Sequence, residues 1–280
     1  MLEGELADAK AEGFSLFAVI VLYRLRPSES AAFKTLQTAI SRGGSREMYV
    51  KVLLYDNTPG GCDPGALPEG VQYEAAKQNA GLAAAYNRAL EIAEAEGFDW
   101  LLTLDQDTSL PEHFVSRLSE IADRISLNNS IAAIVPQITE NGRALSPYWF
   151  RLGFIPRYFP IGFAGVPKQA SSAFNSASTV RVSALRMIGG YNPRFWLDYS
   201  DFYLYRQLYR YGKRIYIAGD IQVEHQFSIL DMNHRVTLAR YKNILDAGCA
   251  FWDLELGWLA GLDSGIIYFT PWANLSRMST

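Results

Sequence analysis

The chain has 280 residues, of which 49% are hydrophobic and 20% are charged, a balance typical of a globular protein rather than a disordered one. The formal net charge of −3 argues against a protein that binds nucleic-acid phosphates, which would carry a basic excess. The two cysteines, Cys62 and Cys249, lie far apart and form no CxxC motif, which argues against a disulfide framework and a zinc ribbon.

The N-terminal residues 1–12 include acidic side chains where a secretory signal would carry a basic cluster and an apolar run. The first apolar run, residues 16–23, is much shorter than the roughly 20 residues that a membrane-spanning helix needs. It is rich in β-branched residues and predicts a buried strand. We therefore expect a cytoplasmic protein, and peripheral contact with the inner face of the plasma membrane stays open.

Strand and helix patterns then alternate along the first half of the chain. The predicted strands are residues 16–23, 49–55, 71–74, 99–104 and 131–135. The predicted helices begin near Pro27, Asn79 and Pro111. This alternation predicts an α/β fold with a Rossmann-like, mostly parallel central sheet and helices on both faces. In such sheets, ligands bind beyond the carboxyl ends of the strands.

The second half has a different pattern. An irregular aromatic stretch covers residues 148–163, and predicted helices at 182–188 and 202–212 precede a strand at 214–218. No Ser-rich or Pro-rich linker separates the halves, so we predict one domain over residues 15–245, with halves 15–140 and 141–245. Residues 1–14 form an N-terminal extension, and residues 246–280 form an aromatic-rich, helical C-terminal tail.

Acidic residues follow two of the predicted strands. Asp105 and Asp107 come directly after one strand, and paired carboxylates there suit Mg²⁺ or Mn²⁺, which also bind substrate phosphates. Asp56 ends another strand and would accept a hydrogen bond from a pyrimidine N–H. The alternatives are a plain turn at 105–107 and an Asx-turn at Asp56.

A second acidic pair, Asp198 and Asp201, lies at or near the start of a predicted helix. One of them would be a general base, and the surrounding aromatic residues favour a dry pocket that raises a carboxylate pKa. The alternative is an N-cap together with a charge that complements the helix dipole. His225 is a metal-ligand candidate only if the fold brings it near Asp107, since a lone His is more often structural.

Other catalytic motifs are missing from the sequence. It has no phosphate-binding P-loop, no GxSxG nucleophile elbow and no GxGxxG after the first strand. ATP chemistry of the P-loop class, a serine hydrolase of that type and a dinucleotide-binding fold are therefore not supported.

Taken in order, six motifs resemble those of the family 2 glycosyltransferases, which have the GT-A fold. They are AVIVLY at 18–23, LYDNT at 54–58, NAGLAAAYN at 79–87, LDQD at 104–107, IGGYNPRFWLDYSD at 188–201 and EH at 224–225. The resemblance spans roughly residues 15–230. The Asp-Tyr-x-Asp form of the fifth motif is most similar to the bacterial rhamnosyltransferase-like branch, which builds cell-surface polysaccharide.

The resemblance implies a role for each matching residue. In the implied nucleotide-binding half, Asp56 would read a uracil or thymine ring, with Tyr23 near the base. The other nucleotide-binding positions are Asn57, Asn79, Gly81, Asn87 and Asp105, the last of these near the ribose and diphosphate. Asp105, Asp107 and His225 would hold Mn²⁺ or Mg²⁺. In the acceptor half, Asp198 or Asp201 would be the catalytic base.

Two positions depart from the family pattern. Many relatives have Glu-Asp-x-Asp where this chain has Asp198-Tyr199-Ser200-Asp201, so Tyr199 occupies the usual base position and the choice of base stays open. Relatives often have a Ser-Gly pair where this chain has Ser176-Ala177, and the alanine narrows the space beside the sugar.

We therefore expect inverting, metal-dependent transfer of a sugar, with rhamnose as a candidate, from a dTDP-sugar or UDP-sugar donor. The acceptor would be a hydroxyl of a saccharide or of a lipid-linked acceptor in cell-surface polysaccharide synthesis. A nucleotidyltransferase would need a Gly-rich loop after the first strand, and residues 23–27 have no glycine. A non-catalytic nucleotide-sugar-binding or scaffold protein remains an alternative because the base motif is altered.

The C-terminal tail is rich in Trp, Tyr and Phe over residues 248–280. We expect it to pack on the domain or on a second subunit, as in a homodimer, because a large bare apolar patch is rare. The alternative is an element at the membrane interface, where Trp and Tyr are favoured. Three acidic residues in the tail, Asp253, Glu255 and Asp263, argue against that alternative because anionic lipids would repel them.

Overall fold

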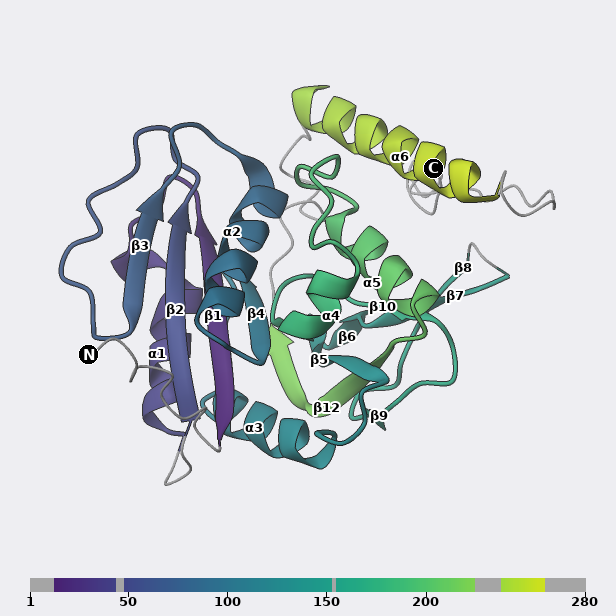
Figure 1. The fold of residues 1–280 in the computed structure, drawn as a ribbon, viewed down its shortest axis with the longest axis horizontal. Coiled ribbons are helices and arrows are strands. Elements are labelled where there is room, and N and C mark those ends of the chain that lie inside the picture. The colour runs from purple at the N-terminus through teal and green to yellow at the C-terminus, as the bar shows by residue number, and fades with distance from the viewer. Residues whose placement is uncertain (1–12, 44–47, 153–154, 225–237, 260–280) are drawn as a thin grey trace, which may run out of the picture.

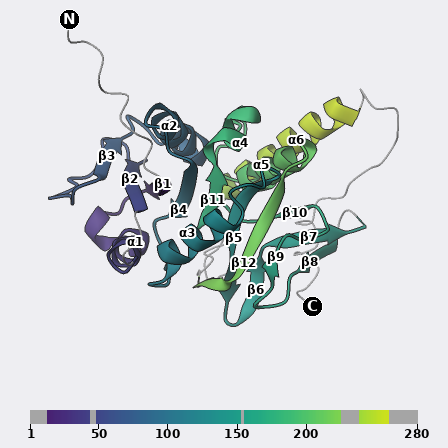
Figure 2. The same cartoon turned by 60° about the horizontal axis from the view of Figure 1, so that its bottom comes forward.

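The computed structural model of the chain describes residues 13–43, 48–152, 155–224 and 238–259. A nine-stranded sheet with the order β3-β2-β1-β4-β11-β5-β12-β9 forms the centre of the molecule, and β6 pairs with β5 beside this path. Helices cover both faces of the sheet (Figures 1 and 2). The predicted α/β fold with a mostly parallel central sheet is therefore confirmed.

The first half has the predicted alternation. Its strands are β1 (Phe14–Leu22), β2 (Met48–Asp56), β3 (Val71–Ala75), β4 (Trp100–Asp105) and β5 (Ile131–Glu140). Its helices are η1 (Pro27–Glu29), α1 (Ala31–Ser41), α2 (Gly81–Ala95) and α3 (Phe114–Arg124). The strands β3, β2, β1 and β4 are parallel neighbours, so their carboxyl ends share one edge.

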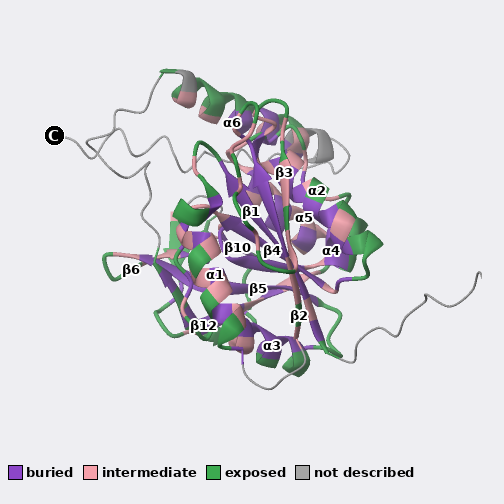
Figure 3. Cartoon of the chain, turned by 90° about the vertical axis from the view of Figure 1, so that its left-hand side faces the viewer, coloured by how far each residue is buried: buried purple, intermediate pink, exposed green. Residues whose placement is uncertain are grey.

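The continuous apolar run of β1 is explained by burial on both faces of the sheet. Phe17, Val19 and Val21 belong to the core on the α2 side, whereas the alternate residues Leu16 and Ile20 belong to the core on the side of α1 and α3. A strand covered on both faces has no polar face, which is why its sequence does not alternate. Figure 3 shows the buried strands enclosed by helices with exposed outer faces.

The second half differs from the sequence prediction in its strands. Its further elements are β6 (Arg143–Ser146), β7 (Tyr148–Arg151), β8 (Ile155–Tyr158), β9 (Ala164–Gly165), β10 (Ser171–Ser172), β11 (Ser178–Arg181), α4 (Val182–Met187), α5 (Ser200–Arg210) and β12 (Arg214–Glu224). The aromatic stretch predicted to be irregular contains the β7–β8 hairpin, which forms a small sheet with β10. The strand β11, which pairs antiparallel with β4 and β5, was not predicted. Short strands of this kind have too few residues to show a periodic pattern.

Helix α6 (Leu238–Leu259) crosses the boundary at 245/246 that the sequence predicts between domain and tail. It packs on α5, where the Phe251 and Phe202 ring centroids are 4.9 Å apart. Glu255, which is 3% exposed, pairs with Arg210, with its Oε2 2.8 Å from Nη2. The described part of the tail therefore packs on the domain, and residues 260–280 lie outside the described residues. No helix in the described ranges has the length and apolar character required to cross a membrane.

Candidate active site

Two of the predicted acidic positions lie at the same edge of the central sheet. Asp56 ends β2 and pairs in register with Leu22, and Asp105 ends β4 and pairs with Val21. The two aspartates therefore flank the end of β1, where parallel α/β sheets bind ligands. The prediction that these acidic positions share one sheet edge is confirmed.

The carboxylate of Asp56 is fully buried and accepts hydrogen bonds from within the chain. Its Oδ1 accepts from the Thr58 backbone N at 2.8 Å, which is the Asx-turn that the sequence left as the alternative. Its Oδ2 accepts from the Tyr73 hydroxyl at 2.7 Å and the Cys62 backbone N at 2.9 Å. Burial opposes the charge, but these hydrogen bonds outweigh it and lower the pKa of Asp56.

Asn57 and Asn79 hold the start of α2. Asn57 donates from Nδ2 to the Gly81 carbonyl at 3.1 Å and accepts at Oδ1 from the Ala80 backbone N at 3.1 Å. Asn79 accepts at Oδ1 from the Gly81 backbone N at 3.1 Å. The Gly81 N–H is one of the donors that the first turn of a helix leaves without an intrahelical partner, and Asn79 accepts from it. Both asparagines therefore fix the backbone near the predicted nucleotide site.

Gly81 connects the two halves of the molecule. Its φ is +80°, and a Cβ at this position would lie 2.4 Å from the Trp196 carbonyl oxygen. The next residue, Leu82, donates its backbone N–H to the same oxygen at 2.8 Å. A side chain at position 81 would therefore push the 191–199 loop away from α2.

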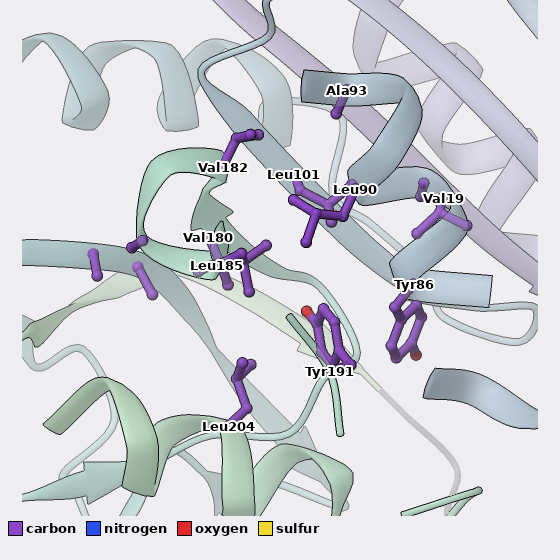
Figure 4. Packing of buried hydrophobic residues seen from close by; sticks show 14 of the residues in the cluster. Val19, Tyr86, Leu90, Ala93, Leu101, Val180, Val182, Leu185, Tyr191 and Leu204 are labelled. Carbon is purple, nitrogen blue, oxygen red and sulfur yellow. The ribbon is translucent and has the colours of Figure 1, made fainter. Parts of the chain in front are cut away.

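Asn87 forms a second connection between the halves. Its side chain donates to the Tyr191 carbonyl at 2.7 Å and accepts from the Tyr191 backbone N at 2.8 Å. The Tyr191 ring lies next to the Tyr86 ring, with centroids 4.9 Å apart, as Figure 4 shows. In this structure the Asn87 side chain fixes the loop that leads to Asp198 and Asp201.

The loop after β4 is held by the residue between the two aspartates. Gln106 accepts from the Tyr23 backbone N at 2.8 Å through its side chain, and its carbonyl accepts from the Ser30 hydroxyl at 2.8 Å. Asp105 is half-buried and Asp107 is exposed. Tyr23, predicted to lie near the base, is 38% exposed at the same edge. This arrangement leaves the loop fixed and Asp107 open to solvent.

The donor set at this loop is consistent with a divalent cation. Within the described ranges, no group of three or more His, Cys, Asp or Glu residues is arranged to hold a metal ion. Asp105 and Asp107 provide two carboxylates, and Mg²⁺ or Mn²⁺ sites are commonly completed by water and substrate phosphates. The third predicted ligand, His225, lies outside the described residues.

The carboxylate of Asp198 forms an ion pair within the chain. Both of its carboxylate oxygens accept from the guanidinium of Arg240 on α6, one of them at 2.6 Å. A bidentate pair of this kind occupies both carboxylate oxygens and holds the side chain against α6. Asp198 is also not the N-cap of α5, because that position is Tyr199, with φ +64°. Arg240 could not be predicted as a partner of Asp198 from the sequence, because it lies on a separate, later helix.

Asp201 has a different environment in the first turn of α5. Burial raises its pKa to about 7, and the negative charges of Asp198 and Asp105 act in the same direction, although hydrogen bonding to the Phe202 backbone N opposes them. Because the charge of Asp105 affects the pKa of Asp201, acidic groups from the two halves are close enough to interact. A carboxylate with this pKa is suited to general base catalysis near neutral pH.

A cavity of about 160 Å³ lies between the 191–199 loop and α6. Arg194, Trp196 and Asp198 line it from the loop, and Asn243 and Asp246 line it from α6. Helix α6 therefore forms a wall next to the segment that carries both candidate bases.

Comparisons with known proteins agree with this arrangement. Residues 55–189 match the model of glycosyl transferase family 2. The solved structure of GalNAc-T7 with UDP, GalNAc and Mn²⁺ is 13% identical with a TM-score of 0.58, and the match covers 87% of this chain and 49% of that one. The structure of S. aureus TarS 1–349 in complex with UDP is 12% identical with a TM-score of 0.51, covering 76% of this chain and 61% of that one.

This chain thus spans about half of the first of those structures and three fifths of the second. No curated protein matches the chain. Identities this low establish the fold, and the family match covers the strand ends that carry Asp56, Asp105 and Asp107. The comparisons therefore show a GT-A fold for the chain and a resemblance to glycosyl transferase family 2 over residues 55–189, which are just under half of its length.

Proposed function

We propose that this chain is an inverting, metal-dependent glycosyltransferase that uses a nucleoside-diphosphate sugar donor. The observation that carries the proposal is that Asp201, from the second half, and Asp105, at the end of β4, are close enough for their charges to interact. A protein that only binds a nucleotide sugar would need only the residues at the strand ends. A transferase also needs a second acidic group that can accept a proton, and Asp201 provides it.

Asp201 is our choice for the catalytic base. Asp198 is held by Arg240, whereas burial raises the pKa of Asp201 to about 7. In the proposed step, Asp201 takes the proton of the acceptor hydroxyl as its oxygen bonds to the anomeric carbon. The bond from that carbon to the donor diphosphate breaks on the opposite face, so the configuration of the sugar inverts.

The strand-end residues would bind and orient the donor. Asp105 and Asp107 would hold a divalent cation, which when bound would neutralise the charge that builds on the leaving diphosphate. The buried hydrogen bonds of Asp56 support a role in fixing the 57–62 loop beside the nucleotide base, next to Tyr23. Asn57, Asn79, Gly81 and Asn87 would act by fixing the backbone around the donor and the acceptor loop. Correct placement of two substrates supplies much of the rate enhancement in such reactions.

The finer assignments concern the donor base, the sugar and the acceptor. UDP is bound in both neighbouring structures described above, which supports a uracil or thymine nucleotide as the donor base. Rhamnose rests on the Asp-Tyr-x-Asp motif at 198–201 alone. The proposed acceptor is a hydroxyl of a saccharide or lipid-linked saccharide of cell-surface polysaccharide.

The test is turnover of UDP-sugars and dTDP-sugars, including dTDP-rhamnose, by the full chain with Mn²⁺. We expect release of UDP or dTDP that increases with added acceptor. Nucleotide binding without any release across donors and acceptors would favour the non-catalytic binding protein instead. A variant with Asp201→Asn distinguishes the two because it should retain binding and lose release.

A further inference from the structure

The distribution of charge along the chain is uneven. Residues 141–197 contain seven Lys and Arg and no Asp or Glu, whereas the rest of the chain contains 19 Lys and Arg against 29 Asp and Glu. An acidic protein thus has one continuous basic segment. This segment contains β6 to β11, including the β7–β8 hairpin.

Three of the seven basic residues have partners within the chain. Arg181 donates to the carbonyls of Ile131 and Ile125. Arg186 pairs with Glu94, and Arg194 pairs with Asp253. The other four, Arg143, Arg151, Arg157 and Lys168, are exposed, and none has an ion pair with any other residue in the described ranges. Unpaired exposed cations in one region create a local positive potential.

The two faces of the hairpin have different surroundings. Tyr148, Phe150 and Tyr158 share one face, and that face packs towards the body, where the ring centroids of Phe150 and Phe202 are 5.6 Å apart. Arg151 and Arg157 share the other face, because Arg157 lies opposite Trp149, and side chains alternate along β7. Trp149 on this second face packs against the core, whereas Arg151 and Arg157 are exposed, so the exposed part of this face carries the charge.

Large apolar side chains are exposed around the same hairpin. Leu152 is 74% exposed, Ile161 is 51% exposed and Val166 is 42% exposed. The hairpin extends from the body on the side opposite α1 (Figures 1 and 2). A projecting edge that combines exposed apolar groups with unpaired cations has the composition of a membrane-interface element.

We propose that the β7–β8 hairpin and the adjacent loop at 159–168 form a docking surface for an anionic lipid bilayer. Charge complementarity argues for this partner: the surface is basic, whereas the rest of the chain is acidic and would be repelled by such a membrane. Leu152 and Ile161 enter the headgroup region, and Arg151 and Arg157 contact lipid phosphates. This surface differs from the C-terminal tail, and the proposal does not depend on the proposed catalytic function.

The test measures partition of the full chain onto vesicles of phosphatidylcholine alone and of phosphatidylcholine with phosphatidylglycerol. We expect binding only to the anionic vesicles. The variant R151Q/R157Q should bind about 25-fold more weakly, because each basic residue at an anionic surface strengthens binding about fivefold. The control K34Q/R42Q removes the same charge from exposed positions on α1 and at its C-cap, and it should bind like the unaltered chain.

Two further measurements make the test selective. Raising the salt from about 0.1 M to about 1 M shortens the Debye length from about 10 Å to about 3 Å and should abolish most of the binding. The variant L152S/I161S keeps the charge and should bind about tenfold more weakly because it loses apolar insertion. Thermal unfolding of each variant checks that the fold is retained.

Three outcomes would overturn the proposal. The first is equal binding of the unaltered chain to both vesicle types or to neither. The second is an equal loss of binding to anionic vesicles in R151Q/R157Q and in the control K34Q/R42Q. The third is a preference for heparin or RNA over anionic vesicles with the same dependence on Arg151 and Arg157, which would assign the surface to a soluble polyanion. UDP affinity should be unchanged in R151Q/R157Q, so a failure here leaves the proposed transferase function intact.

Discussion

The two edges of the candidate active site are built in different ways. The strand-end edge, with Asp56 and Asp105, lies on parallel strands whose register fixes both aspartates beside the end of β1. The edge that carries Asp198 and Asp201 lies on a loop and a helix start that are held by distant contacts, from Gly81, Asn87 and Arg240. A regular sheet positions the first edge, whereas a few long-range bonds position the second. The second edge is therefore the one that single substitutions can displace.

The largest expected effect is on the base. Asp201→Asn should lower kcat by about 10²- to 10⁴-fold, because general base catalysis contributes about that much. In the unaltered enzyme, kcat/KM should fall below pH 7, since protonated Asp201 cannot accept a proton and its pKa is about 7. The acidic limb should be absent from the residual activity of the variant. Asp198→Asn is the matched control, and a greater loss there than in Asp201→Asn would reverse the assignment of the base.

Changes at the strand-end edge should affect nucleotide affinity rather than the proton transfer. Asp107→Ala should weaken UDP binding in the presence of Mn²⁺ by roughly tenfold or more, because one carboxylate of a two-carboxylate set is lost. Removing metal from the unaltered chain with EDTA should lower UDP affinity to a similar level. Calorimetric titration measures both. If EDTA leaves the UDP affinity and turnover unchanged, the metal-dependent mechanism is wrong.

The connection between the edges can be tested at Gly81. Gly81→Ala should reduce the free energy of unfolding by about 3 kcal/mol, since it adds a clash with Trp196 to the strain of a left-handed backbone. Gly97→Ala is the matched control, because Gly97 has φ +76° and no atom near its Cβ position. Gly97→Ala should reduce the free energy of unfolding by only about 1 kcal/mol. If urea unfolding shows the same loss of unfolding free energy in Gly81→Ala and Gly97→Ala, the Trp196 contact contributes nothing.

The smallest expected effect concerns the buried carboxylate of Asp56. Tyr73→Phe removes one hydrogen-bond donor to Asp56. It should reduce the free energy of unfolding by about 1 to 3 kcal/mol, because a hydrogen bond to a charged group is lost. The pKa of Asp56 is lowered in the folded state, so its contribution to stability is present above its unfolded pKa and is lost as the pH falls through the folded value. The difference between the variant and the unaltered chain in urea unfolding should therefore shrink in acid. A difference that stays constant at every pH would show that the carboxylate charge is not involved.

The sequence predicted one edge of the site better than the other. The long apolar runs of β1, β2 and β4 mark where these strands end, so the sequence alone predicts Asp56 and Asp105 at a common edge. The choice between Asp198 and Asp201 was not accessible, because it depends on Arg240, which is 42 residues away from Asp198 and reaches it only through the packing of α6 on α5. The hydrogen bond from Tyr73 to Asp56 was missed for the same reason, since a side-chain contact between strands leaves no periodic pattern.

The most direct test of the account is a crystal structure of the chain with UDP and Mn²⁺. We expect the diphosphate beside Asp105 and Asp107, with the carboxylate of Asp201 facing the open sugar position and Asp198 still paired with Arg240. A nucleotide bound away from the ends of β2 and β4, or a sugar position faced by Asp198 with Asp201 covered, would contradict it.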